Sequence, residues 1–224
     1  MSQLSISIPF NDEKGQDTLY VSEANQDAIA YLKLWPNWTN NTTLIIGEEG
    51  SGKSHLASIW QISSKATVID QLDDNTIETL ISTPLTSPII IDLHDIEDHN
   101  KGQADALFHL YNHVKNQQGH LLILCRHHPK SWPHISLDLR SRMMAATILT
   151  IKSPNDDTIA AILVKQLSDR QIQVSPDVIH YLIPRIERRY SYIKQLVQQI
   201  DTITLEQKRK LTIPLIRDIL NVKE

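Results

Sequence analysis

Residues 47–54 read GEEGSGKS and fit the phosphate-loop template G-x-x-x-x-G-K-[ST]. Glycines are needed there because side chains would block the backbone amides from closing around phosphates, and because the turn uses backbone angles that most residues avoid. Lys53 is expected to reach the terminal phosphates, and the Ser54 hydroxyl to bind Mg²⁺. The predicted nucleotide-binding residues are Gly47, Glu48, Glu49, Gly50, Ser51, Gly52, Lys53, Ser54 and His55.

The loop lies between an apolar run at residues 43–46 and a helical pattern at residues 55–60. The positive end of a helix that begins after the loop would point at the bound phosphates. A glycine turn without a ligand is the alternative for such an octamer. The order strand, loop, helix favours the nucleotide site.

A second chemical group stands at the end of the apolar run 88–92, where Asp92 is predicted to hold Mg²⁺ beside the phosphate loop. Hydrolysing enzymes of this architecture usually place an acid at the next position to orient the attacking water, and here that position is Leu93. Leucine cannot accept a proton or hold water. The chain's own ATP hydrolysis is therefore expected to be weak or absent, unless Asp95 or Glu97 substitutes.

Two arginines, Arg140 and Arg142, stand two residues apart just before the last predicted strand. By themselves they are typical surface charges. In nucleotide proteins that form rings, however, an arginine at this place reaches a neighbour's bound triphosphate and stabilises the transferring phosphoryl group.

The composition indicates an ordinary soluble protein: 224 residues, 41% hydrophobic and 21% charged. No apolar stretch reaches the roughly 18 to 20 residues of a membrane span, and the polar N-terminus lacks the pattern of a signal peptide. The single cysteine, Cys125, agrees with a reducing compartment, so a cytoplasmic location is expected. The net charge of -4 argues against broad nonspecific binding of nucleic acid.

Apolar runs separated by segments long enough for helices predict an α/β fold with a five-stranded parallel sheet. After residue 152 the pattern is helical only, which predicts a small helical lid domain. We expect three parts: residues 1–12 as an N-terminal peptide, 13–152 as the nucleotide-binding domain and 153–224 as the lid. The five expected strands are residues 42–46, 66–70, 88–92, 120–125 and 147–151.

The chain resembles the Hda branch of the bacterial replication initiator (DnaA) family, within the AAA+ class of P-loop NTPases. The resemblance covers nearly the whole chain. It implies an AAA+ core with ATP or ADP and Mg²⁺ bound, the initiator DnaA as a partner, and Arg142 as an arginine finger that acts in trans. The residues that carry it are GSGKSHL at 50–56, Asp92, FHLYN at 108–112, Pro129 and Lys130, SRM at 141–143, RKLTIP at 209–214 and an adenine-side segment at 18–25.

Three positions depart from the family pattern. Leu93 replaces the second acid, Arg126 stands at the sensor-one position, and Ser191 stands where the lid arginine of sensor two is expected, with Arg188 and Arg189 as candidates to replace it. Together these departures predict a nucleotide that is held as a structural ligand and turned over poorly.

The N-terminus resembles the short peptide by which partners bind the sliding clamp. Alternate apolar side chains of an extended segment would enter a groove while a glutamine anchors it by hydrogen bonds. An ordinary edge strand alternates in the same way and is the alternative. The predicted clamp-binding residues are Gln3, Leu4, Ser5, Ile6 and Ile8.

The leading hypothesis is a regulator that binds adenine nucleotide and the DNA polymerase III β sliding clamp and promotes hydrolysis of ATP bound to DnaA, so that initiation of replication is negatively regulated. The alternatives are a self-sufficient DNA-remodelling ATPase of the helicase-loader kind and a structural adaptor. No DNA-reading domain is expected after the lid, so we predict no sequence-specific DNA binding and no membrane association. The sequence leaves a homo-oligomer open.

Overall fold

Buried apolar runs form one parallel sheet in the computed structural model, which describes residues 21–93, 101–133 and 135–221. The strands lie in the order β2-β3-β4-β1-β5, and every pair of neighbours is parallel. This confirms the predicted five-stranded parallel sheet. The strands are β1 (Thr42–Ile46), β2 (Thr67–Ile69), β3 (Ile89–Leu93), β4 (Leu121–Cys125) and β5 (Thr147–Thr150).

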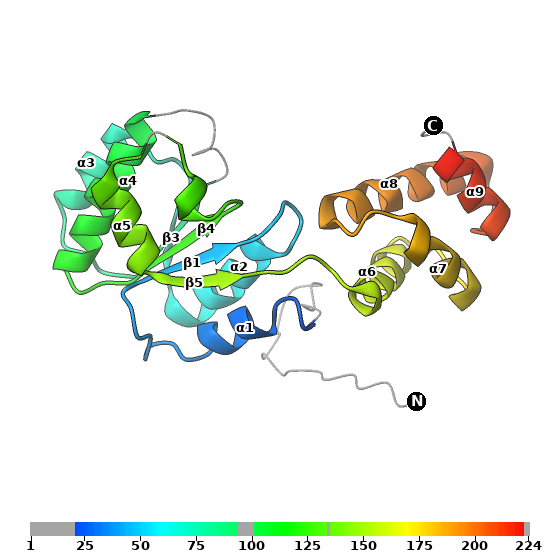
Figure 1. The fold of residues 1–224 in the computed structure, drawn as a ribbon, viewed down its shortest axis with the longest axis horizontal. Helices are drawn as coiled ribbons and strands as arrows, with labels where there is room; N and C mark the ends of the chain where they lie inside the picture. The colour runs from blue at the N-terminus through cyan, green and yellow to red at the C-terminus, as the bar shows by residue number, and fades with distance from the viewer. Residues whose placement is uncertain (1–20, 94–100, 134, 222–224) are drawn as a thin grey trace.

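Helices cover both faces of the sheet (Figure 1). One face packs against α3 (Asp74–Ile81), α4 (Lys101–Asn116) and α5 (Leu137–Ala145). The other packs against α1 (Gln26–Leu32) and α2 (Lys53–Ser64). Both faces of each central strand are therefore buried, as expected for parallel strands that read as continuous apolar runs.

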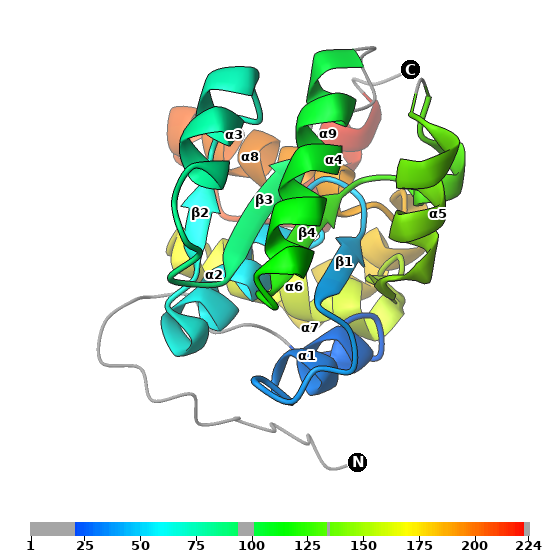
Figure 2. The same cartoon turned by 90° about the vertical axis from the view of Figure 1, so that its left-hand side faces the viewer.

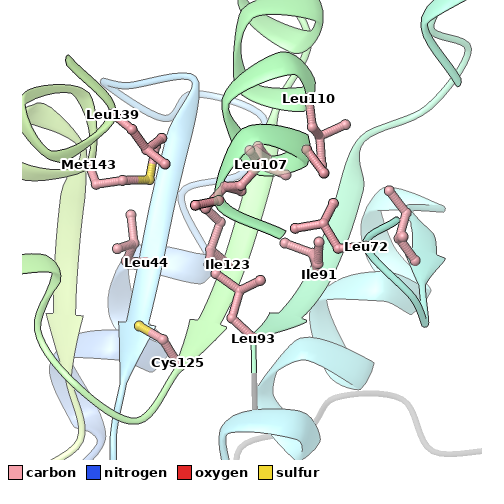
Figure 3. Packing of buried hydrophobic residues seen from close by; sticks show 14 of the residues in the cluster. Leu44, Leu72, Ile91, Leu93, Leu107, Leu110, Ile123, Cys125, Leu139 and Met143 are labelled. Carbon is pink, nitrogen blue, oxygen red and sulfur yellow. The ribbon is translucent and has the colours of Figure 1, made fainter. Parts of the chain in front are cut away.

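The alternation of side chains along a strand decides which face each residue joins. On β3, Ile91 and Leu93 lie in the cluster under α3, α4 and α5, whereas Ile90 lies in the cluster under α1 and α2. Figure 3 shows Leu93 among the packed side chains of the first cluster, near Cys125 and Ile123. Asp92, between Ile91 and Leu93, therefore leaves the opposite face of the sheet, on the side of α2.

A separate bundle follows β5 and builds its own apolar core. It consists of α6 (Asp156–Asp169), α7 (Pro176–Leu182), α8 (Tyr190–Gln207) and α9 (Ile213–Asn221). Figure 1 shows the bundle beyond the carboxyl ends of β1 and β5, and Figure 2 shows it behind the sheet from the side. The boundary expected at residue 152 falls in the connection between β5 and α6.

Two short 3-10 turns, Pro129–Ser131 and Ile183–Arg185, complete the regular structure of these residues. Within the described ranges, no helix has the length and apolar character needed to cross a membrane. The predicted clamp-binding residues, Gln3 to Ile8, lie outside the described residues, as do Asp95 and Glu97.

Candidate nucleotide site

The phosphate loop leaves β1 and enters α2 through two glycines in the left-handed region. Gly50 has φ +78° and Gly52 has φ +93°, angles that side-chain-bearing residues rarely adopt. Gly52 is the N-cap residue of α2, so the first turn of the helix opens directly onto the loop. A Cβ built on Gly52 would meet no atom within 4 Å. The space beside the loop backbone is therefore open at the helix N-terminus, where an anion is favoured.

Lys53 is folded back onto the loop. Its Nζ donates to the carbonyl oxygens of Gly47, at 2.7 Å, and Glu48, at 2.9 Å. The residue is only 4% exposed, and this burial lowers the pKa of its ammonium, against which the charge of Asp92 acts. The positive charge is thus fixed inside the loop, where a phosphate would gain most from it.

Ser54 and Asp92 meet at the tip of β3. The Ser54 hydroxyl donates to Oδ2 of Asp92 at 3.3 Å. A hydroxyl and a carboxylate oxygen are the hard ligands that Mg²⁺ accepts together with phosphate oxygens and water. The two predicted metal-side residues are brought together, and their chemistry fits the ion.

A cavity of about 430 Å³ lies between the phosphate loop and the lid. That size is in the range of small-molecule sites. Its lining includes Ser22 and Asn25 before α1, the loop residues Gly50 to Gly52, and Ile162 of α6. The cavity is therefore shared by the core, the adenine-side segment predicted at residues 18–25, and the lid.

Two side chains on the loop side of this cavity hold buried polar atoms without a hydrogen-bond partner within the described part of the chain. They are Oγ of Ser51 and Nε2 of His55, and both residues line the cavity. Buried polar groups are nearly always paired in folded proteins. Their position beside an open cavity fits a polar ligand such as a nucleotide.

Two of the predicted nucleotide-binding residues make other contacts. Glu48 accepts a hydrogen bond from Ser153 at 3.4 Å, and Glu49 pairs with Arg126 at 3.5 Å. Neither glutamate lines the cavity. Within the predicted loop, Gly50, Ser51, Gly52 and His55 face the cavity, while Lys53 and Ser54 stand on the side of β3.

The lid presents a residue that the sequence reasoning missed. Arg188 pairs with Asp156 at 2.9 Å and Arg189 with Glu187 at 2.6 Å, and neither arginine lines the cavity. Lys194 does line it, three residues after Ser191 on α8. The helical spacing that places residues three apart on one face could have identified Lys194, which lines the cavity together with two other lid cations, Lys165 and Arg170.

Arg142 is held firmly on α5. Its Nε and one terminal nitrogen donate to the two carboxylate oxygens of Asp138, at 2.8 and 2.9 Å, and the other terminal nitrogen donates to Oδ1 of Asn112 at 2.6 Å. The guanidinium also lies over the rings of Phe108 and Tyr111, at 5.1 and 5.5 Å. The hydrogen bond to Asp138 raises the pKa of Arg142 and lowers that of the carboxyl.

The residues that hold Arg142 explain one of the sequence motifs. Phe108, Tyr111 and Asn112 all belong to the segment at 108–112 that carries the family resemblance, although the sequence alone gave them no role. Arg142 is 29% exposed and does not line the cavity. The motif therefore supports an arginine at the surface of α5.

Comparison with known sequences gives two related findings. Residues 156–220 match the family model of the Hda lid domain. The chromosomal replication initiator protein DnaA of Buchnera aphidicola is 23% identical over 199 residues, which cover 81% of this chain and 46% of that protein. The chain thus spans about half the length of this curated relative.

Solved structures show the same fold. Domain III of the Thermotoga maritima replication initiation protein DnaA has a TM-score of 0.70 at 18% identity, covering 89% of this chain and 94% of that one. AMPPCP-bound DnaA from Aquifex aeolicus has a TM-score of 0.65 at 19% identity, covering 81% and 63%.

The five-stranded parallel sheet, the phosphate loop and the helical bundle form an α/β core followed by a helical lid. The arrangement is the one seen in domain III of DnaA. The chain is thus similar to Hda in its lid, and to DnaA in sequence and in fold.

Proposed function

We propose that this chain regulates the initiation of chromosomal replication by presenting Arg142 to ATP held by the initiator DnaA. The observation that carries the proposal is the division between its two sites. Arg142 is fixed at the surface of α5 by its partners Asp138 and Asn112, outside the lining of the chain's own cavity. Leu93 stands at the position where a hydrolysing enzyme would carry its catalytic acid, and its side chain is buried in the core.

Adenine nucleotide is proposed to bind between the phosphate loop and the lid. Lys53 and the loop amides would hold its phosphates, Ser54 and Asp92 would hold Mg²⁺, and Lys194 would approach from the lid. The ion supplies charge neutralisation of the phosphate oxygens when it is bound. The Aquifex structure contains AMPPCP in a protein of the same fold, which supports this assignment.

The sliding clamp is the second proposed partner, through Gln3, Leu4, Ser5, Ile6 and Ile8. A short extended peptide binds reversibly and tethers the protein near DNA. The tether would raise the local concentration of Arg142 around an initiator on the same DNA. We propose that this takes place in the cytoplasm.

The alternative of a self-sufficient remodelling ATPase is disfavoured by the packing of β3. Such an enzyme needs an acid to orient water beside the γ-phosphate. Leu93 is 4% exposed and belongs to the apolar cluster under α4. Its side chain is therefore part of the core and offers no proton acceptor.

The test is hydrolysis of labelled ATP preloaded on DnaA, with DNA-loaded clamp and this chain added. An arginine supplied in trans contributes about 10³- to 10⁵-fold in rate, so Arg142→Ala should abolish the acceleration. Arg142→Lys should also be inactive, because lysine keeps the charge but lacks the planar fork. Full acceleration by either variant would refute the finger.

Two controls separate the steps. Arg217→Ala removes an exposed arginine of α9 and should leave the rate unchanged. If the clamp tethers the chain, the double variant Gln3→Ala/Leu4→Ala should lose the acceleration at low protein concentration. It should regain the acceleration at high protein concentration. An acceleration that is indifferent to this double variant would remove the clamp from the proposal.

A further inference from the structure

Three consecutive cations, Lys208, Arg209 and Lys210, form the turn between α8 and α9. They are the chain's only run of three lysines or arginines, and we call them the cationic turn. Lys208 caps α8 with φ +51°, and Leu211, which is 7% exposed, belongs to the apolar core of the lid. All three cations are exposed. The turn is therefore anchored at both ends while its charged side chains reach solvent.

The positive charge of the cationic turn has no internal counter-charge. Nη1 of Arg209 donates to Oε1 of Gln207 at 3.1 Å, which is a neutral partner. None of the three cations forms an ion pair with a residue in the described ranges, whereas Arg188 and Arg189 of the same lid each pair with an acid. The first turn of α9 also contains no acid. Such an unbalanced positive potential attracts an external anion.

The dipole of α8 accounts for only one of these cations. A cation at the C-terminus of a helix is stabilised by the partial negative charge there, but the effect falls off within one turn. Lys208 stands at that position, as does Lys65 at the end of α2, with φ +56°. Arg209 and Lys210 lie beyond the cap. Their charge therefore needs a different explanation.

The cationic turn lies at the end of the lid that is remote from the nucleotide cavity. Helix α8 has 18 residues and is therefore about 27 Å long. It begins at Tyr190, which lines that cavity, and ends at the turn. Figure 1 shows α5 on the side of the core away from the lid. A ligand at the turn would thus leave both the nucleotide cavity and Arg142 accessible.

The surroundings of the turn favour a chain of phosphates over an acidic protein. A cavity of about 850 Å³ lies beside it, between α8 and α9, and its lining includes Arg209 but also Asp201 and Asp218. A protein partner covers about 800 Å² of surface, so an acidic one would meet these carboxylates and the exposed Glu206. A phosphate backbone needs to contact only the turn, where the Gln207 amide adds a donor of the kind that binds phosphate oxygens.

We propose that the cationic turn binds the phosphate backbone of DNA without reading its base sequence. Lysine and arginine contacts to phosphates supply affinity but carry no direct sequence information. The patch is small, which agrees with a chain whose net charge is -4. The binding itself requires neither nucleotide nor Arg142, and only its role rests on the proposed function. There it gives the chain a second contact with the DNA on which the clamp is loaded.

The experiment is fluorescence anisotropy of a labelled duplex of random sequence with the full chain, without clamp, DnaA or nucleotide. Three neutralised phosphates contribute about -2.7 to the slope of log K against log salt, so affinity should fall about 40-fold between about 50 and 200 mM salt. The triple variant Lys208→Gln/Arg209→Gln/Lys210→Gln keeps long polar side chains but removes the charge. It should lose this salt dependence and bind at least about tenfold more weakly at low salt.

The chain offers a matched control for the loss of charge. Lys65→Gln removes an exposed lysine that caps a helix in the same left-handed conformation as Lys208. It should leave the affinity for DNA and the salt slope unchanged, whereas Lys208→Gln should reduce the slope by about 0.9. Because all these side chains are exposed, the melting temperatures of the variants should equal that of the wild type.

Unchanged DNA binding by the triple variant would overturn the proposal, and so would an equal loss in Lys65→Gln. A strong preference for one of two unrelated duplexes would contradict a contact with the backbone alone. Binding of a hexaglutamate peptide with no binding of DNA would assign the turn to an acidic protein instead. None of these results touches the role of Arg142, which is measured by hydrolysis of ATP on DnaA.

Discussion

Replacing Leu93 by glutamate tests whether the missing acid could simply be restored. The side chain is 4% exposed and lies in the cluster formed by β3, β4, α4 and α5 (Figure 3). A carboxylate introduced there would enter the hydrophobic core instead of the nucleotide site. We therefore expect Leu93→Glu to destabilise the fold and to leave ATP turnover at the wild-type level.

The expected loss in free energy of unfolding has two contributions. Losing the burial of a leucine side chain costs about 1.5 to 3 kcal/mol. Burying a polar carboxyl without a partner costs a further 1 to 3 kcal/mol, roughly, from mutational data. The free energy of unfolding should fall by about 3 to 5 kcal/mol, a large share of the roughly 5 to 15 kcal/mol that holds a domain together.

The assay is urea unfolding of the wild-type chain, Leu93→Glu and Leu93→Met at several pH values. Methionine conserves the volume and should cost less than about 1.5 kcal/mol. Burial raises the folded-state pKa of the new carboxyl above its ordinary value of about 4.3, so the unfolded chain loses the proton first. The stability deficit of Leu93→Glu should therefore be smallest near pH 4 and grow towards pH 7.

The opposite result would refute the reasoning about β3. If Leu93→Glu were as stable as Leu93→Met, with no dependence of the deficit on pH, its side chain would not lie in the core. If it also hydrolysed ATP, position 93 would reach the nucleotide. The alternative of a self-sufficient ATPase architecture would then regain support.

Three other substitutions probe the lid, the loop and the core. Asn155→Ala removes the cap of α6, which accepts from the amide and hydroxyl of Thr158 at 2.9 and 2.7 Å; chemical denaturation should show a loss of about 1 kcal/mol, and Asn155→Asp should retain the cap. Gly50→Ala forces a side chain into φ +78°, with its Cβ 3.4 Å from that of Tyr190. The resulting strain of about 1 kcal/mol should raise the Kd for ATP and for ADP about fivefold each. Unchanged affinity would show that the loop relaxes. Trp60→Ala removes a 1% exposed ring that stacks on Trp38 at 4.7 Å, and it should cost about 3 to 5 kcal/mol in urea unfolding, more than Trp60→Phe.

The sheet could be predicted because each central strand is buried on both faces and therefore appears as an uninterrupted apolar run. The edge strand β2 is the least regular case: residues 66–70 were expected, but the strand is Thr67–Ile69, with Val68 exposed. At a sheet edge fewer side chains are constrained by packing, so the sequence marks the ends of a strand less clearly.

The short helices could not be predicted from apolar periodicity. Helices α3 and α5 have eight and nine residues, and their starts depend on single hydrogen bonds from the Thr76 amide to Asp73 and from the Leu139 amide to Ser136. The missing prediction of α5 also hides the contacts of Arg142. Without α5 the sequence gives no reason to place Asp138 one turn from Arg142.

The nucleotide motif was found from local sequence because the phosphate loop is contiguous. The lid side of the cavity is built from segments more than 100 residues away, so its lining depends on how the two domains meet. In the sequence, charge and position near Ser191 favour Arg188 and Arg189 as the lid cations. The structure pairs both with acids of the lid and places three other lid cations, Lys165, Arg170 and Lys194, at the cavity.

The phosphate loop runs close to the first residue of α8, because a Cβ built on Gly50 would lie 3.4 Å from the Cβ of Tyr190. The Tyr190 hydroxyl also donates to the Lys152 carbonyl at 3.2 Å, at the connection between core and lid. A ligand in the cavity touches both domains, so its binding energy depends on the angle between them. By thermodynamic reciprocity, a partner that holds the lid at one angle must change nucleotide affinity by the same factor by which nucleotide changes the affinity for that partner. The angle between core and lid would then depend on the bound nucleotide without any hydrolysis in this chain.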